Sequence, residues 1–259
     1  MTEYQIILLI ASGVIVGFIN TLAGGGSIIS LAIMMFLGLP PQVANGTNRI
    51  AVLFQTLASA GLFRHHKMLE FRSASRLAIP AVVGSVAGAQ LAVDINEHIF
   101  RITIAVLLIF VMVAMFVNPG QWIAGNEQKV EKKTGWVRII VFFGIGLYGG
   151  FIQAGVGYFL LAAIVLGEGY NLVKANAIKV WIVLLYTPFT LGVFIINGQV
   201  AWMFGLTHAI GNIIGALIAA QMAVKQGAKF VRWVIVVFII VTAADLTGLI
   251  NLNDLLSKQ

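Results

Sequence analysis

Two glycine-rich breaks interrupt the longest apolar stretches of this 259-residue chain. The first is NTLAGGGS at 20–27, and the second is IQAGVGY at 152–158. Glycine is a poor helix former, and irregular backbone inside a bilayer is tolerated only where it is buried in protein or lines a cavity. A helix that begins after each break would direct free N–H groups and a partial positive charge into that cavity. The breaks therefore predict anion binding; the alternative is that these glycines only allow close helix packing.

Two cations follow the breaks, each in a polar cluster at the start of an apolar run. ANGTNR at 44–49 carries Arg49, and ANAIK at 175–179 carries Lys179. A membrane-embedded cation is costly and usually functional, although a cation near a helix end also reaches the surface by snorkelling. Arginine suits bidentate recognition of an oxyanion, and lysine supplies a point charge. The candidate substrate-binding residues are Asn20, Thr21, Gly24, Gly25, Gly26, Ser27, Asn45, Thr47, Asn48, Arg49, Gln153, Gly155, Gly157, Tyr158, Asn176 and Lys179.

Carboxylates are nearly absent from the apolar stretches. A cationic substrate would require them as partners, so the pattern favours an anionic substrate. Asp245, near the end of the last stretch, is the exception. It either carries a coupling proton or is an interfacial residue at a helix end. The chain has no cysteine and no nucleophile–base or zinc-ligand spacing, so we expect neither an enzyme nor a metal or cofactor site.

Membrane-spanning helices are the elements that would position these residues. The sequence is 60% hydrophobic and 10% charged, with a mean hydropathy of +0.99, and about 20 apolar residues cross a bilayer. The net charge of +7 does not indicate a nucleic-acid partner, because the cations lie mostly in short loops between apolar blocks. We expect an all-α polytopic membrane protein, whose first stretch is a membrane segment rather than a removed signal peptide. The eight apolar stretches are 5–37, 44–63, 74–93, 99–117, 136–166, 175–196, 200–222 and 233–250.

The two halves of the chain are similar in sequence. A shift of 131 residues aligns Gly24–Phe63 with Gly155–Phe194, and 12 of these 40 positions are identical. About three or four identities would arise by chance in a chain so rich in small and aliphatic residues. The longest polar segment, the linker 118–135, separates a first repeat at 1–117 from a second at 136–259. We expect each repeat to hold one glycine-broken helical hairpin plus three transmembrane helices, all within one integral membrane domain.

The distribution of lysine and arginine predicts the orientation in the membrane. If the two long stretches are hairpins that enter and leave on the same side, 13 of the 16 cations lie on one side of the membrane. The positive-inside rule makes this side cytoplasmic, together with the linker 118–135, and places both termini outside. Each half then crosses an odd number of times, so the two halves are inverted repeats, as in many secondary transporters.

The sequence resembles the sulfite exporter TauE/SafE family, also grouped as TSUP permeases. The resemblance is carried by GFINTLAGGGSIISLAIMMFLGLPPQVANGTNRIAV at 17–52, and by GGFIQAGVGYFLLAA and ANAIKVWI in the second half. It implies transport of a small sulfur-containing oxyanion, such as sulfite or an organosulfonate, across the cytoplasmic (inner) membrane. The second half departs from the pattern, because its glycine break is two residues shorter and Gln153 takes the place of Asn20.

We therefore expect a secondary transporter that exports or imports this anion by alternating access. Two alternatives remain open: an anion channel with the same site, and a membrane assembly subunit that transports nothing. The expected partners are the anion and the lipid bilayer. The pattern leaves open the identity of the anion, the direction, the coupling ion and whether the chain forms a homo-oligomer.

Overall fold

In the computed structural model, the described residues are 1–92 and 135–246, with side chains described as far as 238. All regular elements in these residues are helices. The predicted stretch 99–117, nearly all of the predicted linker and the residues after 246 lie outside the described part. The elements are α1 (Glu3–Leu22), α2 (Ser27–Phe36), α3 (Pro41–His65), α4 (Phe71–Ala92), α8 (Trp136–Phe151), α9 (Val156–Ala162), the π-helical turn η1 (Ala163–Gly167), α10 (Leu172–Ile196) and α11 (Trp202–Leu246).

Local sequence explains where several helices begin. Thr2 and Gln5 form a capping box at the start of α1: Thr2 N donates to Gln5 Oε1 at 3.0 Å, and Gln5 N donates to Thr2 Oγ1 at 3.3 Å. Asn171 caps α10 by accepting a hydrogen bond from Lys174 N at 3.1 Å. Pro41 occupies the first position of α3, where its missing N–H costs nothing.

Both predicted glycine breaks are present. Residues 23–26 separate α1 from α2, and residues 152–155 separate α8 from α9. Gly24 and Gly155 have φ angles of +90° and +78°, a left-handed conformation that glycine adopts without strain. The predicted stretches 200–222 and 233–250 both fall largely in α11, which bends at Gly227, where φ is +76°. The predicted long stretches 5–37 and 136–166 are therefore each a pair of helices joined by a glycine turn.

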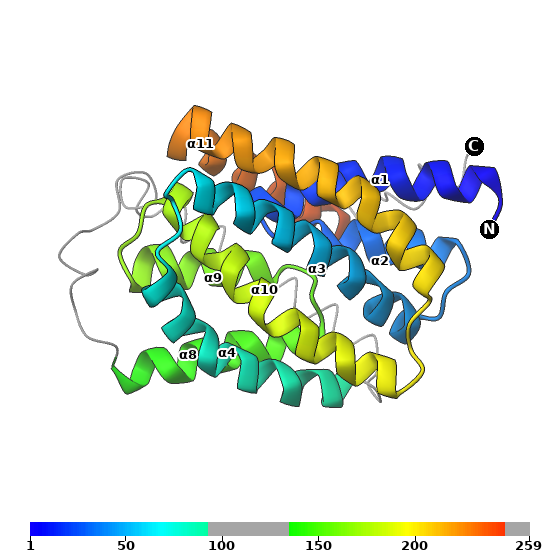
Figure 1. The fold of residues 1–259 in the computed structure, drawn as a ribbon, viewed down its shortest axis with the longest axis horizontal. Helices are drawn as coiled ribbons and strands as arrows, with labels where there is room; N and C mark the ends of the chain where they lie inside the picture. The colour runs from blue at the N-terminus through cyan, green and yellow to red at the C-terminus, as the bar shows by residue number, and fades with distance from the viewer. Residues whose placement is uncertain (93–134, 247–259) are drawn as a thin grey trace.

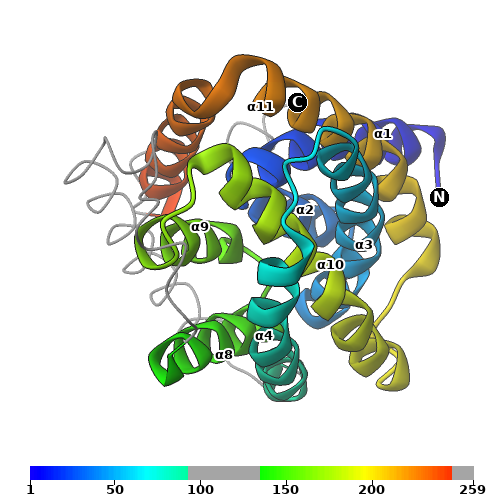
Figure 2. The ribbon, with the colours of Figure 1, turned by 60° about the vertical axis from the view of Figure 1, so that its left-hand side comes forward.

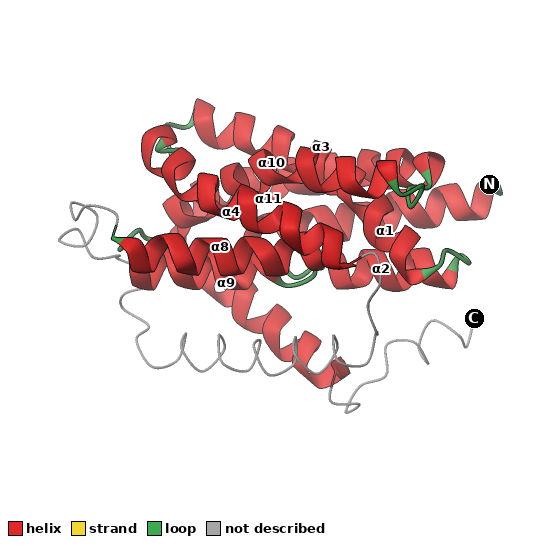
Figure 3. Cartoon of the chain, turned by 90° about the horizontal axis from the view of Figure 1, so that it is seen from below, coloured by secondary structure: helices red, strands yellow, loops and turns green. Residues whose placement is uncertain are grey.

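The described helices form three layers (Figures 1 and 2). α1 packs along α11 in one outer layer, and α8 packs along α4 in the other. α3 and α10 lie between these pairs and contact each other. Figure 3, seen from below, shows α8 and α4 side by side. The first helix of each half therefore lies against a long helix of the other half.

In the pairs α4–α8 and α11–α1, the two backbones approach each other closely at glycine residues. Gly88 of α4 lies against the backbone of Leu147 in α8, and Gly215 of α11 lies against the backbone of Val14 in α1. A Cβ atom at either glycine would overlap the facing carbonyl oxygen. Small residues at helix interfaces allow this packing in membranes, where van der Waals contact rather than hydrophobic transfer holds helices together.

The chain has the lengths and surface of a membrane protein. In the described part, four helices are long and apolar enough to cross a bilayer: Glu3–Leu22, Phe71–Ala92, Leu172–Ile196 and Trp202–Phe238. α3 is also long, at 25 residues, but it is less apolar because it contains several polar residues. Most of these polar residues face the interior. Large apolar side chains cover the outer surface, as at Ile196 and Trp136, which are 86% and 72% exposed. Such a surface suits lipid.

The two hairpins open toward opposite ends of the molecule (Figure 1). The N-terminus, the α2–α3 connection and the α10–α11 connection lie at the right-hand end. The start of α8, the α3–α4 connection and the η1–α10 connection lie at the left-hand end. The chain therefore enters and leaves the first break from one end of the molecule, and it enters and leaves the second break from the other end.

Candidate functional site

The two glycine breaks meet in the interior. Gly24 of the first break and Gly157, at the second residue of α9, lie backbone to backbone. A Cβ atom added to either glycine would overlap the Cα atom of the other. Sequence alone predicted that both breaks belong to one site, and the structure brings these segments together across 133 positions of sequence.

Asn20 closes the first break. Its Oδ1 accepts a hydrogen bond from Ser27 N at 3.1 Å, and its Nδ2 donates to Ser27 Oγ at 3.2 Å. The last turn of α1 and the first turn of α2 are thus tied through one side chain. Because Asn20 already takes up the first N–H of α2, this helix start is less free to bind an anion than the sequence suggested.

The second break is closed differently. Tyr148 OH donates to the carbonyl of Ala154 at 2.7 Å, and Gly155, in the left-handed conformation, precedes α9. Gln153 does not cap α9; its Oε1 instead accepts hydrogen bonds from Arg49 at 3.2 Å and from Tyr186 OH at 3.1 Å. The residue at the position of Asn20 therefore faces α3 and α10 rather than its own helix.

Arg49 of the first half binds the end of α8 in the second half. Its Nη2 donates to the carbonyl of Gly150 at 2.6 Å, and its Nη1 donates to the carbonyl of Gly149 at 3.0 Å and to Thr190 Oγ1 at 3.1 Å. The guanidinium also lies 5.0 Å from the centre of the Phe194 ring, and the residue is fully buried. A helix C-terminus carries partial negative charge, so this position suits a cation.

Lys179 of the second half binds the end of α1 in the first half. Its Nζ donates to the carbonyls of Asn20 at 3.1 Å and Thr21 at 2.8 Å, and to Asn176 Oδ1 at 2.7 Å. Three acceptors around one nitrogen match the three N–H donors of an ammonium group. The ion pairs of the described residues are Arg138–Glu168 and Lys174–Glu70, so in this part neither Arg49 nor Lys179 has a carboxylate partner.

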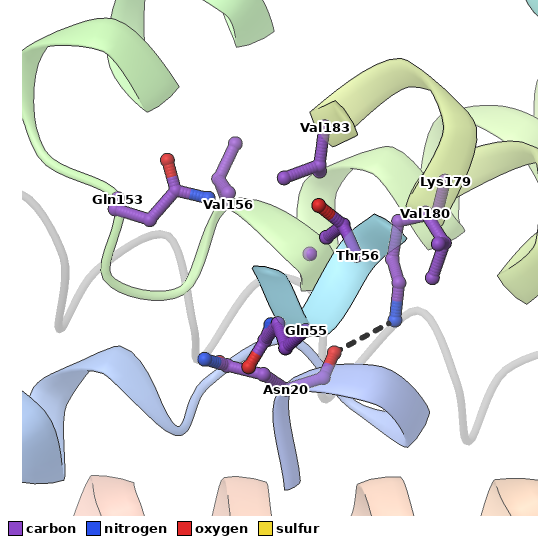
Figure 4. Close-up of a pocket in the computed structure, with 10 residues that line it drawn as sticks. Asn20, Gln55, Thr56, Gln153, Val156, Lys179, Val180 and Val183 are labelled. Atoms are coloured by element: carbon purple, nitrogen blue, oxygen red, sulfur yellow. Dashed lines mark hydrogen bonds between the residues drawn. The ribbon is translucent and has the colours of Figure 1, made fainter. Parts of the chain in front are cut away.

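A small cavity lies where the breaks, α3 and α10 meet (Figure 4). About 20 Å³ of it is open to the centre of a water molecule, which is room for one ordered water. Among the described residues its polar side chains are amides and a hydroxyl, Lys179 is its charged residue, and no carboxylate lines it. The lining consists of Asn20, Gly24, Gln55, Thr56, Gln153, Val156, Gly157, Lys179, Val180 and Val183.

The candidate residues divide into those that line the cavity and those that support it. Lining positions are held by Asn20, Gly24, Gln153, Gly157 and Lys179. The structure places the others outside the lining: Thr21, Gly25, Gly26, Ser27, Asn45, Thr47, Asn48, Arg49, Gly155, Tyr158 and Asn176.

Several of the supporting residues join helices. Asn45 donates to the carbonyl of Phe151 at 3.0 Å, and Thr47 accepts from Ala201 N at 2.9 Å, so both tie α3 to the second half. Asn48 is fully buried. Asp245 lies in the part of α11 whose side chains are not described, and its proposed role in proton coupling stays a prediction.

Sequence reasoning missed five lining residues: Gln55, Thr56, Val156, Val180 and Val183. A signal was available for the polar two. Gln55 follows Asn48 by seven residues, two helical turns along the same face of α3. Thr56 aligns with Thr187 in the repeat. The valines carry no such signal, because apolar residues are everywhere in α9 and α10.

Comparison with known proteins yields one family and several relatives. The model of the family described as "Sulfite exporter TauE/SafE" matches residues 9–246. A probable membrane transporter protein, ORF9, from Sinorhizobium sp. is 26% identical over 92% of this chain and 90% of its own length. The probable membrane transporter protein YfcA of Escherichia coli K12 is 27% identical over 89% of this chain and 85% of its own length. A probable membrane transporter protein of Haemophilus influenzae is 26% identical over 89% of both chains. No solved structure matches.

Proposed function

Because the chain belongs to the TauE/SafE family of membrane transporters, we propose that it is a secondary transporter for a small sulfur-containing oxyanion such as sulfite or an organosulfonate. It exports or imports this anion across the cytoplasmic membrane by alternating access. The family match and the apolar helices establish a multi-pass membrane protein. The substrate, the orientation and the mechanism are the proposal.

One observation carries the proposal: a cavity that is lined by a buried lysine and, among the described residues, by no carboxylate. Lys179 Nζ lies at this cavity, and Asn20 and Gln153 bring amide groups to it from the two breaks. The partial negative charge at the end of α1 offsets only part of the charge of a buried cation, and an oxyanion would supply the rest while it accepts hydrogen bonds from the lining amides. A cation would find no counter-charge among the described lining residues, so the chemistry of the lining supports an anionic substrate.

The path of the chain supports inverted halves and alternating access. The hairpin of the first half opens toward one end of the molecule and that of the second half toward the other (Figure 1). The cations of the α3–α4 connection and of the first turn of α8 belong to the left-hand end, which the positive-inside rule makes cytoplasmic. The N-terminus, at the other end, is then outside, and we place the C-terminus there as well. Rocking of one half about the shared cavity would expose it to each side in turn.

The size of the cavity favours a transporter over an anion channel. A channel needs an open pore with several weak sites, whereas this cavity has room for about one water molecule. An oxyanion of four or more heavy atoms enters only if the two breaks move apart. Such a movement is the step that alternating access requires.

Flux into proteoliposomes tests the proposal. We expect saturable uptake of at least one anion among sulfite, sulfate, thiosulfate, sulfoacetate and taurine, and we expect Lys179→Met to lower it about 100-fold, since it removes the charge at the cavity. Lys174→Met is the matched control on the same helix: Lys174 pairs with Glu70 at 3.0 Å, outside the cavity, and its loss should leave uptake unchanged.

Other outcomes of this experiment would contradict the proposal. Uptake that does not saturate and ignores an imposed pH gradient would identify a channel. Failure of the wild-type protein to move any anion in the panel would favour a subunit role without transport.

A further inference from the structure

The carboxamide of Gln153 has a fixed orientation. Its Oε1 lies 3.2 Å from Arg49 Nη1 and 3.1 Å from Tyr186 OH. A guanidinium nitrogen can only donate a hydrogen bond, so the atom that faces it must be the amide oxygen and not the amide nitrogen. The usual ambiguity between the two ends of a glutamine side chain is therefore removed here.

This orientation turns the NH₂ group of Gln153 toward the cavity. Gln153 is buried, with 4% of its surface exposed, and it lines the cavity. Figure 4 shows its nitrogen on the side of Val156 and its oxygen pointing away. An NH₂ group offers two hydrogen-bond donors and no acceptor. In this orientation Gln153 favours an oxyanion, and in the opposite orientation it would repel one.

Arg49 and Tyr186 themselves stay outside the lining. The Nη atoms of Arg49 are directed to the carbonyls of Gly149 and Gly150, to Thr190 and to Gln153. Both residues therefore reach the cavity only through the side chain of Gln153.

We propose that Arg49 and Tyr186 are positioning residues that hold Gln153 as a hydrogen-bond donor to the transported oxyanion. This inference rests on the proposed function and adds to it the source of selectivity for oxygen acceptors. Asn20 needs no such help, because a backbone donor, Ser27 N, fixes its Oδ1. Gln153 at the second break has no equivalent backbone donor in the described part, and two side chains from α3 and α10 supply the donors instead.

Tyr186→Phe is the cleanest test, because it removes one hydroxyl group and no charge. We expect the sulfite concentration for half-maximal uptake to rise about fivefold with little change in the maximal rate, the effect of losing one neutral hydrogen bond. The matched control is Thr187→Val, whose hydroxyl donates to Val183 of its own helix, and it should leave the half-maximal concentration unchanged. If sulfite is not transported, the anion with the highest wild-type uptake takes its place.

A double-mutant cycle separates positioning from a general structural effect. In a Gln153→Ala background the Tyr186→Phe change should have no further effect on the half-maximal concentration. An equal effect in both backgrounds would overturn the inference. Arg49→Lys, which keeps the charge but loses the fork that reaches Gln153, should behave in the same way with a change of about tenfold.

Gln153→Glu tests the donor role without loss of the acceptor for Arg49. The carboxylate still accepts from Arg49 and Tyr186, so the protein should fold, but an oxygen replaces NH₂ at the cavity. We expect sulfite to bind about 100-fold more weakly because two negative groups then meet in a buried site. Retained affinity in Gln153→Glu or Gln153→Ala would overturn the inference and leave the proposed function standing, whereas absent saturable transport by the wild type would overturn both.

Discussion

Arg49 and Lys179 make equivalent contacts in the two halves of the chain. Each lies near the start of the long central helix of its own half, α3 or α10, and each donates to the carbonyls that end the first helix of the other half. Arg49 thereby ties α3 to α8, and Lys179 ties α10 to α1. In both cases the negative end of a broken helix replaces the carboxylate that a buried cation usually requires.

The two cations differ in their position relative to the cavity. Arg49 is covered by Phe194 and lies behind Gln153, whereas Lys179 Nζ lies at the cavity itself. Water in the cavity can replace Lys179 as the hydrogen-bond donor to the carbonyl of Asn20, whereas Gly149 and Gly150, which accept from Arg49, lie outside the cavity lining. The comparison indicates that Arg49 mainly holds the structure and Lys179 mainly provides the charge for binding.

The largest expected effect is on stability, in Arg49→Met. This change removes the Arg49 donors from the buried carbonyls of Gly149 and Gly150, so we expect a loss of about 3–5 kcal/mol in the free energy of unfolding. Lys179→Met should cost less than half as much, because cavity water can reach the carbonyls that it releases. Chemical unfolding of both purified variants in detergent measures the difference.

Equal losses in these two variants would contradict the comparison. They would mean that both cations are structural to the same degree and that the cavity gives Lys179 no special role.

A smaller effect is expected where the two breaks touch. Gly24→Ala places a Cβ atom against Gly157 and requires a φ near +90°, so we expect a loss of about 2–3 kcal/mol. Gly61→Ala is the control: no atom lies within 4 Å of its added Cβ, and alanine is the better helix former, so a gain of about 0.5–1 kcal/mol is expected. Thermal unfolding midpoints in detergent report both changes. A Gly24→Ala variant as stable as the wild type would show that the breaks do not meet.

The smallest effect concerns a cation that does have a carboxylate partner. Arg138 pairs with Glu168 at 3.0 Å at the end of the bundle. Burial raises the pKa of Glu168 above its usual 4.5, and the nearby Arg138 only partly opposes this. The protonated form is thus favoured by folding, so its contribution to stability is present below pH 4.5 and is lost as the pH rises through the raised pKa.

We therefore expect Glu168→Gln to reduce the difference in the free energy of unfolding between pH 4.5 and pH 7 by less than about 1 kcal/mol. Unfolding midpoints at the two pH values measure this difference. A larger difference in this variant would mean that Arg138 dominates and that the pKa is lowered instead. Either result allows the contribution of the Arg138–Glu168 ion pair to stability to be compared with those of the interior contacts of Arg49 and Lys179.

Much of the fold was predictable because its signals are local. Glycine clusters break helices wherever they occur, and residues 23–26 and 152–155 are breaks in the structure. The 131-residue repeat matches the start of α3 at 41 with that of α10 at 172, and the start of α4 at 71 with that of α11 at 202. The predicted stretch 99–117 lies outside the described residues. That α1 pairs with α11 and α8 with α4 is a long-range outcome that local patterns do not encode.

The candidate site was predictable in its chemistry but not in its contacts. Residue type and burial cost point to Arg49 and Lys179, yet which helix end each cation reaches depends on the packing of α1 and α8 against α11 and α4. Gln153 differs from Asn20 by one methylene, and the sequence gives no hint that its partners come from α3 and α10. The separation of lining from supporting residues is therefore a result of tertiary structure.

A crystal structure with selenite, a heavier analogue of sulfite, tests the central claim most directly. We predict one selenium peak in the anomalous difference map at the cavity, within hydrogen-bonding distance of Lys179 Nζ and Gln153 Nε2, and no such peak in Lys179→Met. A peak away from the cavity, or one that persists at full height in Lys179→Met, would contradict the account.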